Sequence, residues 1–184
     1  MQQTSYTIKS HIVLAAEYNQ WINQRLYSVV GQLDETAFSA ARGAFFSSIS
    51  GTLNHIMVAD LIWLNRFKKH STPVSALLQA LGTFPQPQTL SSILYPDFNS
   101  LQDARRELDQ LIIELCNALQ EKDLDKVLVY TNTKGQPFNK KLGFLLQHFF
   151  NHQTHHRGQL TTLLSQLELD VGVTDLLVIT PDAL

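Results

Sequence analysis

The segment from Ser47 to Lys69 constrains the fold most strongly, because apolar side chains surround this predicted helix on almost every side. Its apolar residues are Ile49, Leu53, Ile56, Met57, Val58, Leu61, Ile62, Trp63, Leu64 and Phe67. A helix that is apolar all round is usually buried on more than one face. One face can pack inside a bundle while another meets a partner subunit. We therefore expect this chain to form a homodimer.

Three further segments show the apolar spacing that is typical of long helices. They cover residues 7–30, 98–120 and 140–167, and Gly31 follows the first of them as a helix-ending residue. Together with the segment 47–69 they make four long predicted helices. The sequence therefore predicts an all-α fold class.

The connections between these helices differ in character. Residues 71–96 contain four prolines and are expected to form a long connector with one short helical piece over 74–81. Between the third and fourth long helices, residues 127–130 favour a strand, 132–135 a turn and 136–140 a returning strand. This pattern predicts a small β-hairpin at that point of the chain.

Composition and charge exclude several classes of protein. The 184 residues are 44% hydrophobic and 16% charged, as expected for one globular domain spanning residues 1–184. A net charge of −2 without a basic block disfavours nucleic-acid binding.

The single cysteine, Cys116, has apolar neighbours and is expected to be a core residue rather than a nucleophile. We see no secretory signal and no apolar run of about 18 residues, so we expect a soluble, cytoplasmic protein without membrane contact. The tail from Glu168 is expected to cover the helices.

A histidine cluster interrupts the fourth predicted helix. On a helical wheel, His152 and His156 fall within its apolar stripe, His148 and His155 lie at the edge, and Arg157 points away. The stripe consists of Leu145, Phe149, Leu160, Leu163 and Leu167. Burying two imidazoles is costly unless each nitrogen has a partner, and one metal ion would serve both rings. The alternative is a pair of hydrogen-bonded structural histidines.

A metal site of this kind needs a third ligand from another helix. Three histidines lie outside the fourth helix. His70 follows two lysines at the end of the second helix and is expected to be solvated, and His11 is expected near the surface. His55 lies in the middle of the most apolar helix and is therefore the best candidate, although spacing alone does not decide its role.

Asp60 is the other polar residue in an unexpected place, because it shares the apolar stripe of the second helix. It could support a ligating histidine through that ring's other nitrogen. The alternative, which we favour, is a structural hydrogen bond or an ion pair with an arginine on a neighbouring helix.

Several stretches of the sequence together resemble the DinB-like family of metal-dependent helical-bundle proteins. This damage-inducible family is distinct from the DNA polymerase that shares its name. The resemblance lies in Gly51–His55, Ala59–Asp60, Trp63 and His152–Gln159, with further likeness in Tyr18–Leu26, Tyr130–Gly135 and Thr174–Leu177. It implies an antiparallel four-helix bundle, commonly dimeric, with a three-histidine metal site. The ligands of that site correspond here to His55, His152 and His156.

The resemblance also implies a class of chemistry. Three neutral imidazoles leave the charge of a divalent ion and some coordination positions available, and zinc or nickel suits such a ligand set. Relatives resemble thiol-dependent transferases and isomerases, and also suspected hydrolases. We therefore expect a metal-dependent enzyme of the thiol S-transferase or hydrolase type, acting on a small molecule such as a low-molecular-weight thiol. The competing hypothesis is a non-catalytic stress-response protein that binds metal. His148 and His155 are expected to flank the site, and no general base stands out.

Overall fold

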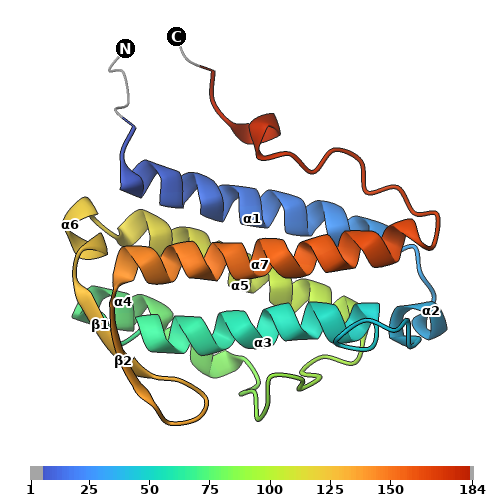
Figure 1. Cartoon of the computed structure of the whole chain (residues 1–184), viewed down its shortest axis with the longest axis horizontal. Helices are drawn as coiled ribbons and strands as arrows, with labels where there is room; N and C mark the ends of the chain where they lie inside the picture. Colours follow the sequence, from blue (N-terminus) through green and yellow to red (C-terminus); the bar gives the residue numbers. More distant parts are fainter. Residues whose placement is uncertain (1–5, 183–184) are drawn as a thin grey trace.

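Four long helices lie side by side and form the main body of the molecule (Figure 1). The computed structural model describes residues 6–182. The expectation that the chain has no secretory signal concerns its first residues, of which residues 1–5 lie outside this range. The long helices are α1 (Ile8–Val30), α3 (Ile49–Phe67), α5 (Phe98–Ala118) and α7 (Leu142–Ser165). Each observed end lies within two residues of the predicted one. The predicted long helices are therefore confirmed.

The packing of these helices brings α3 and α7 together. α1 packs against α5 and α7, and α3 packs against α7 and α5. In Figure 1, α1 and α7 run in the same direction, and α3 runs opposite to them. The fold is thus mostly helical, but it is less simple than a strictly antiparallel four-helix bundle.

Shorter elements fill the connections between the long helices. Within residues 6–182 they are α2 (Glu35–Ser39), α4 (Thr72–Leu77), α6 (Glu121–Leu124) and two 3₁₀ helices, η1 (Leu78–Thr83) and η2 (Leu176–Ile179). α4 and η1 correspond to the short helical piece predicted over 74–81. The sequence pattern does not predict α2 and α6, because helices of four or five residues are too short to show a hydrophobic period.

The predicted β-hairpin is confirmed. Strands β1 (Val127–Thr131) and β2 (Pro137–Lys141) pair antiparallel, with Val127 opposite Lys141 and Thr131 opposite Pro137. Gly135 has a φ of 77° in the connecting turn, a conformation that glycine adopts without strain. The hairpin ends directly at the start of α7 and so sets where that helix begins.

Helix α3 is buried by its own chain. Every residue from Ile49 to Leu61 is buried within one copy of the molecule, covered by α2, α5, α7 and η1. An all-round apolar sequence is therefore explained without a partner subunit. The homodimer stays a prediction, and α3 no longer supports it.

The C-terminal tail folds back over the helices, as predicted. It returns along α1 in Figure 1. The Tyr18 hydroxyl donates a hydrogen bond to the Thr174 carbonyl, and the Arg25 guanidinium donates one to the Val171 carbonyl at 3.2 Å. Between residues 6 and 182, no helix has both the length and the apolar character that crossing a membrane requires.

Candidate metal centre

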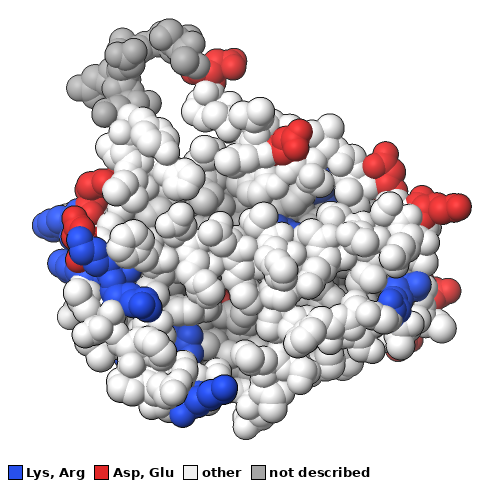
Figure 2. Space-filling view, in the orientation of Figure 1, with Lys and Arg blue, Asp and Glu red and all other residues white. Residues whose placement is uncertain are grey.

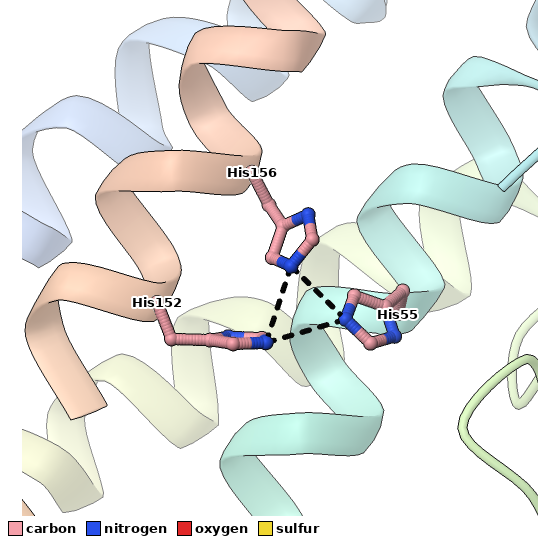
Figure 3. Close-up of side chains that lie close together, drawn as sticks. All are labelled: His55, His152 and His156. Atoms are coloured by element: carbon pink, nitrogen blue, oxygen red, sulfur yellow. Dashed lines mark hydrogen bonds between the residues drawn. The ribbon is translucent and has the colours of Figure 1, made fainter. Parts of the chain in front are cut away.

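Three histidines from two helices meet at one point. His55 extends from α3, and His152 and His156 extend from successive turns of α7 (Figure 3). Their Nε2 atoms are 3.3 Å apart between His55 and His152, 3.2 Å between His55 and His156, and 3.1 Å between His152 and His156. The structure thus brings together the three residues that the sequence and the family resemblance single out.

These distances fit three ligands of one ion. Zinc–imidazole bonds are about 2.0–2.1 Å long, so two nitrogens on one ion lie about 2.9 Å apart in octahedral geometry and about 3.4 Å apart in tetrahedral geometry. The observed separations of 3.1–3.3 Å fall between these values. The three histidines therefore form a group that can hold a metal ion.

The opposite nitrogens of two rings have partners that fix their tautomers. The His55 Nδ1 lies 2.8 Å from the Leu90 carbonyl oxygen, which can only accept a hydrogen bond. The His156 Nδ1 lies 2.8 Å from the Gln159 Oε1, which also accepts. Both protons are therefore on Nδ1, and both Nε2 atoms present lone pairs to each other. A cation is the partner that satisfies this arrangement.

Electrostatics keep the three rings neutral. Burial lowers the pKa of His55 and of His156. Burial, followed by the neighbouring imidazoles, lowers the pKa of His152 to about 3. At neutral pH the unprotonated form dominates, which is the form that binds metals. His55 and His156 are buried, whereas His152 is partly exposed, so the cluster reaches solvent on the His152 side.

Phe46 forms one wall of the cluster. Its ring stacks on His55 with centroids 3.7 Å apart and planes at 14°. Gly51 allows the chain to turn here, because a Cβ at that position would lie 1.9 Å from the Phe46 carbonyl oxygen. Ser48 then caps α3 by accepting a hydrogen bond from the Gly51 amide at 3.0 Å. The sequence pattern does not predict the role of Phe46, because a loop residue carries no periodic signal.

The other histidines do not join the cluster. His148 lies 6.1 Å from His152 between ring centroids, and His155 is exposed, so both flank the site. His11 is exposed on α1. The expectation for His70 was wrong: its side chain is 2% exposed, with Nε2 3.8 Å from an Asp123 carboxylate oxygen.

Asp60 pairs with an arginine rather than with a ligating histidine, which confirms the favoured alternative. The Arg105 guanidinium donates to Asp60 at 2.6 Å, and the Gln153 amide donates to both Asp60 oxygens at 2.9 Å. Arg105 also forms an ion pair with Asp109 at 2.9 Å. These side chains are buried, so Asp60 belongs to a structural network behind the histidines.

Arg157 extends this buried network, contrary to its predicted outward direction. The side chain is 5% exposed and donates hydrogen bonds to Asn19 and, at 3.2 Å, to the Thr154 hydroxyl. The wheel defined the core face of α7 from apolar residues alone. Because α7 packs against α1 as well as α3, a second face is buried, and polar residues occupy part of it.

Comparisons with known proteins agree with the resemblance. The model of the DinB family matches residues 1–180. Protein DinB of Bacillus subtilis (strain 168) is 28% identical over 160 residues, which cover 86% of this chain and 87% of that protein. A crystal structure of a DinB-like protein from Bacillus cereus ATCC 10987 has a similar fold, with a TM-score of 0.55 at 18% identity, covering 83% of this chain and 90% of that chain. The chain belongs to the DinB family.

Proposed function

We propose that this protein is a metal-dependent enzyme that binds one divalent ion through His55, His152 and His156. A single observation carries the proposal. Three Nε2 atoms converge within 3.3 Å, and in two of the rings the proton is held on Nδ1 by a partner outside the cluster. The ligand set suits zinc or nickel. When bound, such an ion supplies a Lewis acid that lowers the pKa of a thiol or of water.

Among the reactions open to such a site, we favour thiol S-transfer over hydrolysis. Hydrolysis at metal sites commonly uses a nearby carboxylate or histidine as general base. Within residues 6–182, no carboxylate contacts the three histidines, and Asp60 is held by Arg105 and Gln153. Partial burial and the charge of Arg66 lower the pKa of His148, which makes it a weak base.

A thiol requires less help from the protein, because its pKa is already near 8.5. Its proton passes to solvent on the partly exposed side of the cluster, next to His152. The thiolate sulfur then bonds to an electrophilic carbon of the second substrate, and the leaving group departs with its electron pair. Phe46 stacks on one face of the His55 ring and shields that face from water.

Metal binding is tested by elemental analysis of protein reconstituted with zinc or nickel. We expect one ion per chain in the parent and a loss of bound metal in His55→Ala, His152→Ala and His156→Ala. His11→Ala is the matched control, because this exposed histidine lies on α1 and contributes no atom to the cluster. Metal content that is unchanged in all three ligand variants would contradict the site.

Catalysis is tested by the arylation of cysteine with 1-chloro-2,4-dinitrobenzene. In this reaction a sulfur–carbon bond forms and chloride leaves. We expect the rate to require metal and to fall to background in His152→Ala. Activity that survives complete demetallation would overturn the proposed mechanism. A metal-loaded protein that gives only the background rate would instead favour a non-catalytic metal-binding role.

A further inference from the structure

Arg66, near the end of α3, holds its guanidinium group in place without any polar partner. The group lies 4.5 Å from the centroid of Trp63 and 5.1 Å from that of Tyr130. The sequence contains six arginines. Within residues 6–182, the other five donate hydrogen bonds to protein groups, and Arg66 donates none. Its position is therefore fixed by aromatic contacts, and its donors remain free.

The surroundings of Arg66 are positively charged. It lines a hollow of about 580 Å³ together with Lys68, Lys69, Ser75 and Thr131, and no acidic residue lines this hollow. In Figure 2, the blue side chains over the lower part of the β1–β2 hairpin stand apart from red ones, whereas those near α6 adjoin red side chains. Burial lowers the pKa of Arg66, as expected for a cation without a compensating anion. The chain as a whole carries a net charge of −2, so this local excess is distinctive.

Aromatic contacts connect this hollow to the histidine cluster. The ring of Trp63, which lies against the Arg66 guanidinium, has its centroid 5.1 Å from that of His148. The centroids of the His148 and His152 rings are 6.1 Å apart. Arg66 follows His55 by eleven residues on the same helix, which corresponds to about 16 Å between their backbone positions along the axis. A small molecule of about that length can reach both places.

We propose that Arg66, assisted by Lys68 and Lys69, binds a carboxylate or phosphate group of the small-molecule substrate. A stacked guanidinium with free donors suits such anions, because it can form two parallel hydrogen bonds to one planar or tetrahedral oxyanion. The substrate is then an extended anion whose reactive end lies at the histidine cluster. The link to catalysis rests on the proposed function, whereas binding of the anion itself does not.

Tryptophan fluorescence tests this site directly. The chain has two tryptophans, so Trp21→Phe leaves Trp63 as the only reporter, in contact with Arg66. Inorganic phosphate and acetate are titrated separately at constant ionic strength, and the stronger of the two identifies the preferred anion. We expect a saturable signal with at least one anion. Arg66→Gln in this background should weaken binding by about tenfold or more, the size of a lost charge-assisted contact.

Two further variants complete the test. Arg106→Gln is the matched control, because it removes an equal charge from an exposed arginine that pairs with Asp103. It should leave the titration unchanged. Arg66→Lys keeps the charge but removes the two parallel donors of the guanidinium group. This variant should therefore bind the anion with intermediate strength. The absence of saturation with both anions, or equal losses in the Arg66 and Arg106 variants, would overturn the site.

Titrating the protein with and without metal separates this inference from the proposed function. Saturable anion binding that depends on Arg66, in a protein that binds no metal, would sustain the anion site and contradict only the proposed function. Metal-dependent arylation without any anion binding would contradict only the anion site.

Discussion

Two polar clusters lie next to each other between the long helices, and they differ in which kinds of group face each other. In the buried network, Asp60 and Asp109 face Arg105, and Gln153 completes the shell of Asp60. In the histidine cluster, three Nε2 atoms face one another. The protons of His55 and His156 are on Nδ1, so the Nε2 atom of neither ring can donate a hydrogen bond to the other. Buried acids that face a buried cation form a structural ion-pair network. Imidazole nitrogens that face one another with lone pairs share one missing partner and indicate a ligand site.

Helix α7 contributes to both clusters, through residues that are adjacent in the sequence. His152 and His156 face α3, while Gln153 and Arg157, the next residues in each turn, face the buried network. Successive residues of a helix point about 100° apart, so one helix supplies both clusters without mixing them. This separation predicts that stability and metal binding respond to different substitutions.

The largest expected effect comes from breaking the network. Asp60→Ala leaves the Arg105 guanidinium short of a buried partner, and removing one member of a buried ion pair costs about 3–5 kcal/mol. Urea unfolding of the metal-free protein measures this loss. Asp103→Ala, which breaks the exposed pair with Arg106, should cost less than about 1 kcal/mol. If Asp60→Ala kept its stability and lost metal instead, the division between the clusters would be wrong.

The next effect is stabilisation by metal. An ion at 100 times its dissociation constant should raise the free energy of unfolding by about 2.7 kcal/mol, because it binds only the folded site. His152→Ala should show no such increase, since it removes one ligand. Unfolding curves with and without zinc test both statements. An equal zinc effect in parent and variant would place the metal elsewhere.

A smaller effect is expected from Gln159, whose Oε1 accepts a hydrogen bond from the Nδ1–H of His156. Gln159→Leu should weaken metal binding by about 10–100-fold, the usual cost of losing a partner of a ligating histidine. Competition with a chromophoric chelator measures the affinity. Gln110→Leu, on the exposed face of α5, is the control and should bind like the parent. An unchanged affinity in Gln159→Leu would mean that this hydrogen bond does not orient the ring.

The last test is the pH dependence of the metal-free protein, in which the effect is spread over several pH units. The His152 pKa is about 3 when folded and about 6.5 when unfolded, so only the unfolded chain takes up this proton in between. Its contribution to stability is complete above pH 6.5 and decreases as the pH falls toward 3, and solvent screening at this partly exposed ring reduces the slope. His152→Ala should flatten the profile of unfolding free energy against pH. A profile equally steep in both proteins would contradict this assignment.

The sequence predicted the parts of this molecule that depend on periodicity. Apolar spacing located the long helices, and the wheel placed His152 and His156 on the face of α7 that meets α3. The helical wheel misplaced Arg157, because a buried face made of polar residues has the same sequence pattern as a solvent-exposed face. Phe46 and Leu90 were missed for a related reason: both lie in loops whose contacts with His55 depend on tertiary structure.

X-ray absorption at the metal edge of the zinc-loaded protein, in a buffer free of imidazole and thiols, tests the central claim most directly. Three imidazole nitrogens at about 2.0–2.1 Å, with at least one additional oxygen donor, are the predicted coordination shell. The same spectrum of His55→Ala should lose one imidazole or show no bound zinc. Two or fewer imidazoles in the parent, or a shell of oxygen donors alone, would contradict a three-histidine metal centre.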